Sequence, residues 1–155
     1  MEINVLIDKG FDGCPAPRWL ESVARQVLEA QGAGAEAEMG LLIATQERVK
    51  ELNREYLGED APTDVLAFSA REEGDALPFV HPPDGLLHLG EVIIAYSQAV
   101  IQAEEHGHPV KKEMAILIIH GLLHLLGYDH DQPDSERRMK AREKELLIYL
   151  EGGLN

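Results

Sequence analysis

The chain has 155 residues, of which 45% are hydrophobic, and it carries a formal net charge of −14 at pH 7. This length predicts a single domain over residues 1–155, with a hydrophobic core of ordinary composition. The acidity argues mildly against a nucleic-acid enzyme, because nonspecific RNA affinity comes largely from Lys and Arg side chains that neutralise phosphates.

Three features of the sequence indicate a compartment. Cys14 is the single cysteine, which excludes an internal disulfide and favours a reducing cytoplasm. No basic-then-apolar signal peptide opens the chain. The longest apolar stretch, residues 115–126, is interrupted by two histidines and is too short to span a bilayer. We therefore expect a cytoplasmic protein that does not contact a membrane.

The first part of the chain alternates strand and helix patterns. Residues 2–7 alternate polar and apolar side chains and predict a strand. Apolar residues at helical spacing then predict an amphipathic helix over residues 17–30. A second strand is predicted over residues 38–44. Thr45 is a good N-cap for the next helix, which Gly58 ends.

The second part begins with a short apolar strand over residues 65–68. Residues 69–85 are rich in Glu, Asp, Gly and Pro and predict a long loop, for which a solvated insertion is favoured over a lid. A fourth strand is predicted over residues 86–95, and Ser97 is suited to cap the helix after it. Three helices follow, over residues 97–106, 110–126 and 134–150.

The helix over residues 110–126 is apolar almost all round after Met114, which is typical of a buried helix. Strands and helices are mixed along the chain, with connections of helix length. The sequence therefore predicts an α+β fold. Its small, mixed, four-stranded sheet packs with about five helices, one of which is central and buried.

This central helix carries His120 and His124. On a helix, residues four apart point the same way, one turn apart, so the two imidazoles are placed to share one metal ion. Gly127 is suited to end the helix and turn the chain, which would bring His130 back as a third ligand. Three protein ligands with a free fourth position are typical of a catalytic zinc site.

The spacing His-x-x-x-His-x-x-Gly-x-x-His is shared with the metzincin proteases. In those enzymes a Glu follows the first histidine directly and acts as the general base. Gly121 occupies that position here. Hydrolysis of peptide bonds therefore stays an alternative that the sequence disfavours.

Three segments of the sequence resemble the YbeY family of bacterial endoribonucleases. The histidine motif is His120-Gly-Leu-Leu-His-Leu-Leu-Gly-Tyr-Asp-His130, against a family pattern HGxLHLxGYDH. An upstream block reads Asn53-Arg-Glu-Tyr-Leu-Gly-Glu-Asp-Ala-Pro-Thr-Asp-Val-Leu-Ala-Phe68, against NxxYxGxDxPTDVLSF. A third block, Leu89-Gly-Glu-Val-Ile-Ile94, resembles the strand LGDIVI.

The resemblance implies an endoribonuclease specific for single-stranded RNA, with the metal cleft at the side of one sheet. We expect one zinc ion there, with another divalent metal as the alternative. It implies a role in maturing the 3′ end of small-subunit ribosomal RNA and in ribosome quality control. The implied partners are ribosomal RNA, proteins of the small ribosomal subunit and an assembly GTPase. The acidic charge leaves a non-catalytic ribosome assembly factor with a structural metal as the second alternative.

The sequence offers several candidates for the general base. Candidates are hydroxide on the metal, the 2′-hydroxyl of the substrate, or a carboxylate near the ligands. The candidate carboxylates are Asp64, Glu91 and Asp129.

Phosphate binding is the part of the site that departs from the family. Many members carry an Arg before the glycine that ends the second helix, and Leu57 stands at that position here. Arg54, one turn earlier, is the candidate replacement. Thr63 is a second candidate contact for substrate, although turn chemistry explains it equally well.

Overall fold

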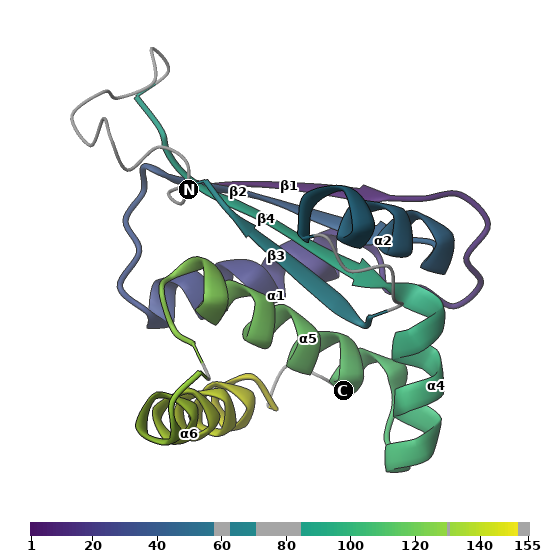
Figure 1. The fold of residues 1–155 in the computed structure, drawn as a ribbon. Helices are drawn as coiled ribbons and strands as arrows, with labels where there is room; N and C mark the ends of the chain where they lie inside the picture. The colour runs from purple at the N-terminus through teal and green to yellow at the C-terminus, as the bar shows by residue number, and fades with distance from the viewer. Residues whose placement is uncertain (58–62, 71–84, 130, 152–155) are drawn as a thin grey trace.

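The computed structural model describes residues 1–57, 63–70, 85–129 and 131–151. The elements follow the predicted order of strands and helices (Figure 1). They are β1 (Glu2–Ile7), α1 (Pro17–Ala30), β2 (Ala37–Ala44), α2 (Gln46–Leu52), the π-helical turn η1 (Asn53–Leu57), β3 (Val65–Ser69), β4 (Leu87–Ala95), α4 (Tyr96–His106), α5 (Val110–Leu125) and α6 (Pro133–Leu150).

The four strands form one mixed sheet in the order β1-β2-β4-β3. β1 pairs with β2 and β2 with β4 in parallel, while β3 pairs with β4 antiparallel and forms one edge. The helices α1 and α2, with the segments that follow them, provide the long crossovers that parallel strands require. The predicted α+β fold with a small four-stranded mixed sheet is confirmed.

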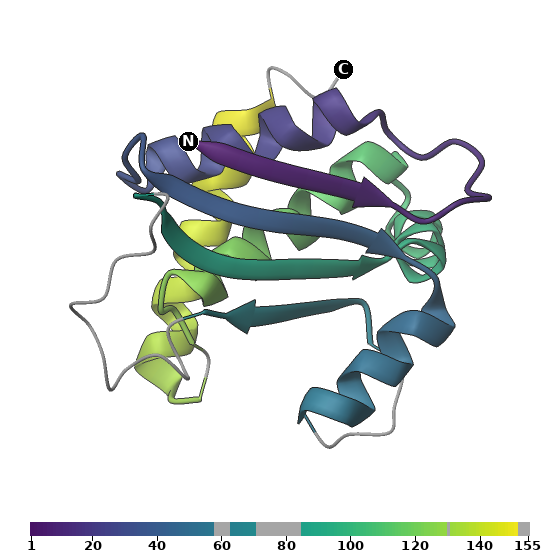
Figure 2. The ribbon, with the colours of Figure 1, turned by 90° about the horizontal axis from the view of Figure 1, so that it is seen from above.

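Helices cover both faces of the sheet. Figures 1 and 2 show α1 and α5 against one face, α6 packed outside them, and α2 on the opposite face. The larger hydrophobic cluster lies between the sheet and the α1–α5 layer and includes Met39, Ile94 and Ile118. A smaller cluster under α2 is built from Ala44, Val49, Leu66, Ile93 and Ala95.

The helix α5 is the central buried helix that the sequence predicts. Met114, Ile118 and Leu122 are fully buried along it. Gly127 follows its end with φ of 100°, a conformation that costs glycine little. The amide of Tyr128 donates to the carbonyl of Leu123 at 2.9 Å, which closes the helix as predicted.

Some element boundaries differ from the sequence prediction. The helix capped by Thr45 ends at Leu52 and continues only as η1, and Gly58 lies outside the described residues. Thr45 does cap α2, because its hydroxyl accepts from the amide of Arg48 at 3.2 Å.

The prediction that Ser97 caps α4 is wrong. β4 runs directly into α4, so Ala95 occupies the N-cap position and provides no side-chain hydrogen bond. β3 is longer than predicted, because Ser69 still pairs with Gly90. The predicted loop over residues 69–85 falls almost wholly outside the described residues.

Within the part of the chain that the structure describes, every helix is too short or too polar to cross a bilayer.

The helix α5 approaches the sheet closely at Gly121. A Cβ added at this glycine would lie 2.6 Å from Cγ1 and 3.0 Å from Cγ2 of Val92 on β4. Both distances are too short for carbon atoms in contact, so a side chain at this position would push α5 away from β4. The position therefore requires glycine although it lies inside a helix.

We expect Gly121→Ala to lower the free energy of unfolding by about 1–2 kcal/mol. Overpacking typically costs about 1–3 kcal/mol, while alanine regains up to about 1 kcal/mol of helix propensity. Val92→Ala removes both clashing methyl groups, so the double variant should be more stable than the sum of the single changes, with a coupling of about 0.5–3 kcal/mol. Urea denaturation of the four proteins measures this coupling, and strictly additive changes would contradict the assignment.

Candidate active site

A cavity of about 610 Å³ lies between the edge strand β3 and the C-terminal half of α5. It brings together both predicted histidines of α5 and three further candidates from the sequence. Its lining residues are Thr63, Asp64, Val65, Leu66, Ala67, Ser69, His120, Gly121, His124, Gly127, Tyr128, Asp129 and Asp131.

The two histidines lie next to each other in this cavity. The ring centroids of His120 and His124 are 4.7 Å apart, with 72° between the ring planes. The rigidity of α5 holds this spacing, because the backbone of both residues belongs to the same buried helix. His130, the third predicted ligand, lies outside the described residues.

Glu143 on α6 contacts His120 from the side. Its Oε2 lies 3.4 Å from Nδ1 of His120, and the side chains are 25% and 32% exposed, respectively. A carboxylate at Nδ1 favours the tautomer with the proton there and leaves Nε2 as the lone-pair donor. The sequence does not single out Glu143 as a site residue, because a contact across 23 positions leaves no periodic signal.

Asp64 and Thr63 come from the turn that leads into β3. The carbonyl of Asp64 accepts from the amide of Ala95 at 2.9 Å, and that of Thr63 accepts from Nε2 of Gln46 at 3.4 Å. These backbone contacts fix the turn to β4 and α2. Both residues are half-buried, and both line the cavity.

Asp129 follows the turn at the end of α5 and is exposed. Its Oδ1 accepts a hydrogen bond from the amide of Asp131 at 3.3 Å. The side chain of Asp129 therefore binds a nearby backbone amide, as Asp side chains often do.

The remaining candidates lie elsewhere. Glu91 lines a second cavity of about 600 Å³ on the α2 face of the sheet. Alternation along β4 explains this, because Val92 faces α5 and its neighbour must face the other way. Arg54 is exposed on η1 and does not line the first cavity. Leu57 is the last residue of η1.

The first cavity is acidic. Its described lining includes Asp64, Asp129 and Asp131 but neither Lys nor Arg. Glu143 adds a further carboxylate beside His120. These residues favour a bound cation and disfavour an anion that arrives alone.

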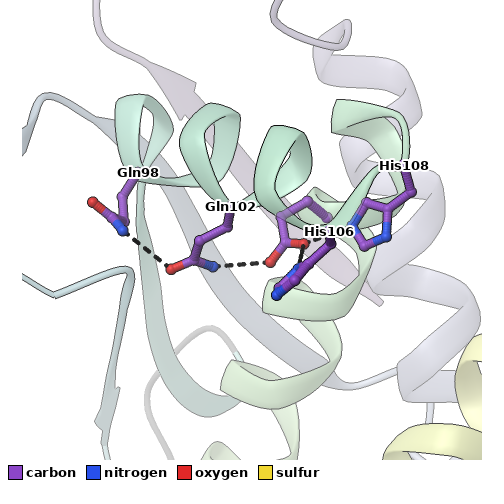
Figure 3. Close-up of polar contacts among 5 residues, drawn as sticks. Gln98, Gln102, His106 and His108 are labelled. Atoms are coloured by element: carbon purple, nitrogen blue, oxygen red, sulfur yellow. Dashed lines mark hydrogen bonds and ion pairs between the residues drawn. The ribbon is translucent and has the colours of Figure 1, made fainter.

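A second group of potential ligands lies where α4 meets α5 (Figure 3). His106, His108 and Glu113 offer ligand atoms that all lie within 4.8 Å of one another, so this group could hold a metal ion. It is the one such group of three among residues 1–57, 63–70, 85–129 and 131–151. Sequence reasoning passed over it, although His-x-His followed by Glu is a visible pattern.

The chain is similar to known proteins over nearly its whole length. Residues 11–151 match the model of the family described as Endoribonuclease YbeY. A protein of Dehalococcoides mccartyi named Endoribonuclease YbeY is 46% identical over 155 aligned residues, covering 97% of each chain. A protein of the same name from Chloroflexus aurantiacus is 40% identical over 149 residues, covering 96% of this chain and 94% of its own.

Among solved structures, the solution structure of TM1509 from Thermotoga maritima has a similar fold. The TM-score is 0.62 at 25% sequence identity, and the match covers 97% of this chain and 89% of the other. Fold, motifs and relatives agree: the chain belongs to the YbeY family of endoribonucleases.

Proposed function

We propose that this chain is a zinc-dependent endoribonuclease that cleaves single-stranded RNA, with residues 1–155 as its single domain. The observation that carries the proposal is the cavity in which His120 and His124 lie side by side, across from Asp64. The names of the relatives support the reaction, because each is an endoribonuclease. The substrate would be ribosomal RNA, at the 3′ end of the small-subunit molecule, during ribosome maturation and quality control.

The residues at the cavity fit a zinc ion. Two imidazoles from one helix face are donors that zinc prefers, and a carboxylate that contacts the other nitrogen of a ligating histidine is a typical outer partner. His120 would bind through Nε2, since Nδ1 faces Glu143, and His124 and His130 would complete the set. When bound, zinc acts as a Lewis acid that polarises a phosphate oxygen or lowers the pKa of water.

Of the three carboxylates that the sequence offers as general base, we favour Asp64 as the proton acceptor. Its backbone is held by Ala95, and its half-buried carboxylate lines the same space as the histidines. Asp129 accepts a backbone amide, and Glu91 lies in the other cavity. We therefore propose that Asp64 accepts the proton of the attacking group, which is either a water molecule or the substrate's 2′-hydroxyl.

Substrate must reach an acidic cavity. With neither Lys nor Arg in its described lining, the divalent ion would neutralise the phosphate, and Arg54 on η1 would at most contact RNA outside the cavity. Partner proteins would supply the remaining affinity. We propose the proteins of the small ribosomal subunit and an assembly GTPase for this role, in the cytoplasm.

Peptide hydrolysis has a physical obstacle in this chain. The Glu that serves as base in metzincins would stand at Gly121, where Val92 occupies the space for even a Cβ atom. A carboxylate could not be introduced there without moving α5. The competing proposal that remains is a non-catalytic assembly factor that uses the metal for structure.

We expect His124→Ala to lose one bound zinc and to lower RNA cleavage by on the order of 10³-fold, because a metal Lewis acid contributes several kcal/mol. The assay uses a single-stranded RNA that ends like a small-subunit precursor, with and without chelator. His88→Ala is the matched control, since His88 pairs with Glu38 on the α2 face of the sheet. Bound zinc without any cleavage by wild type, even with ribosomes added, would favour the assembly factor.

Glu143→Gln should weaken zinc binding at the histidine pair by about 10- to 100-fold, as is typical when a carboxylate behind a ligating histidine is lost. Glu145→Gln is the control on the same helix, because Glu145 pairs with Arg142 instead. Competition titration with a fluorescent zinc chelator gives both affinities. Equal affinities in the two variants would exclude the orienting role of Glu143.

Asp64→Asn should retain zinc and lower the cleavage rate by about 10²- to 10⁴-fold, which is the range for general acid–base catalysis. Rates at saturating RNA, paired with metal analysis of the same samples, separate this effect from metal loss. A cleavage rate near that of wild type would show that a group other than Asp64 accepts the proton.

A further inference from the structure

We propose that His106, His108 and Glu113 form a second site for a divalent transition-metal ion such as Zn²⁺, which fastens α4 to α5. This site does not depend on the histidines in the first cavity. It lies at the junction of the two helices, where His106 ends α4 and Glu113 stands in the first turn of α5. Figure 3 shows His106 and His108 next to each other, and Glu113 contacts both of them.

The distances are near those of a coordinated ion. Oε1 of Glu113 lies 3.1 Å from Nδ1 of His106 and 2.7 Å from Nε2 of His108. In a tetrahedral zinc site with bonds of about 2.0–2.1 Å, neighbouring ligand atoms are about 3.3 Å apart. To reach that spacing, Oε1 would move by about 0.2 Å from His106 and about 0.6 Å from His108. All the ligand atoms of the group lie within 4.8 Å of one another.

The second oxygen of the Glu113 carboxylate is held by a side chain of α4. Oε2 of Glu113 accepts from Nε2 of Gln102 at 2.9 Å, and Oε1 of Gln102 accepts from Nε2 of Gln98 at 3.3 Å. This chain of amides along α4 orients the carboxylate so that Oε1 faces the two imidazoles (Figure 3). Outer partners of this kind are typical of metal ligands.

The backbone places the ligands equally firmly. Gly107 ends α4 with φ of 68°, and the amide of His108 donates to the carbonyl of Ala103 at 3.1 Å. Pro109 then begins α5 as its N-cap residue. The two histidines are thus held by a closed helix end and not by a long loop, which reduces the entropy that metal binding must offset.

Charge gives the reason for an ion at this place. The side chain of Glu113 is 2% exposed, and its oxygens contact the amide of Gln102 and the imidazoles of His106 and His108. Burial raises the pKa of Glu113, but hydrogen bonds from His106, His108 and Gln102 outweigh it, and the pKa lies below its ordinary value. The group is therefore a buried anion beside two imidazoles, and a divalent cation held between these three side chains would offset its charge.

The site is also accessible. The side chain of His106 is 57% exposed and that of His108 is 16% exposed, so an ion can enter from solvent and keep water in its fourth position. The nitrogens that bind the ion are those that donate to Oε1 without it. Binding therefore moves the proton of each neutral imidazole to its other nitrogen and leaves the net charge of the ring unchanged.

The experiment compares wild type, His124→Ala, His106→Ala and the double variant after equilibrium dialysis against Zn²⁺. Each single variant should retain one ion fewer than wild type, and the double variant none. In the His124→Ala protein, Zn²⁺ should raise the melting temperature, and His106→Ala should abolish this rise. Loss of an outer partner typically weakens metal binding by about 10- to 100-fold. Loss of the ligand His106 should weaken Zn²⁺ binding by more than this.

His88→Ala in the His124→Ala background is the matched control, because His88 pairs with Glu38 and does not belong to the group of His106, His108 and Glu113. It should keep the ion and the rise in melting temperature. Circular dichroism with chelator present checks that the exposed His106→Ala change leaves the fold intact. Co²⁺ substitution gives an independent reading, since its visible absorption reports imidazole coordination.

If His124→Ala retains no Zn²⁺ and its melting temperature does not respond, the second site does not exist and the three residues form a hydrogen-bonded group only. If His106→Ala leaves binding unchanged in that background, the ion lies elsewhere and the proposal is wrong. Failure of the first cavity to bind zinc is a separate outcome. In that case wild type and His124→Ala hold the same amount of metal, and His106→Ala still removes it.

Discussion

The close packing of α5 on β4 is the contact on which the rest of the structure depends. Gly121 lets the helix approach until Val92 fills the space that a side chain would need. The apolar residues on either side, such as Ile118 and Leu122, are thereby buried completely between the sheet and α6. Because interiors are packed as densely as organic crystals, a helix held in this way has little freedom to shift.

The same contact determines what the site can do. Holding α5 against the sheet places His120 and His124 across a cavity from the turn that carries Asp64. It also brings α6 near enough for Glu143 to reach His120. Gly121, which allows this approach, stands where metzincin proteases carry the Glu that acts as general base. The packing against Val92 that requires glycine therefore also leaves no room for that carboxylate.

Acidity is the second constraint on the molecule. The net charge of −14 and the acidic lining of the first cavity would repel a polyanion. The divalent cation proposed for this cavity would reverse this locally, because it would supply positive charge at the point where phosphate arrives. Glu113 is a buried carboxylate, whose negative charge is also costly without a cation nearby. Two imidazoles contact this carboxylate as well. Both histidine clusters can thus be understood as ways to place cations in an acidic chain.

What could be predicted from the sequence was local. Periodicity located the strands and helices, the four-residue spacing put His120 and His124 on one face, and Gly127 ended α5 where expected. These features depend on backbone sterics and hydrogen bonds within a few residues, which a sequence pattern records directly. The family motif extended the prediction to the chemistry, because its spacing is specific.

What only the tertiary structure decided was which side chains meet across elements. Strand pairing turned Glu91 to the α2 face, helix packing brought Glu143 to His120, and the direct passage from β4 into α4 left Ser97 without its predicted capping role. His106, His108 and Glu113 are close in sequence, yet the case for a metal site there depends on the burial of Glu113, which no local pattern reports. The sequence by itself therefore determined the elements and the histidine motif. Packing and register, which depend on contacts across many residues, decided the composition of the site.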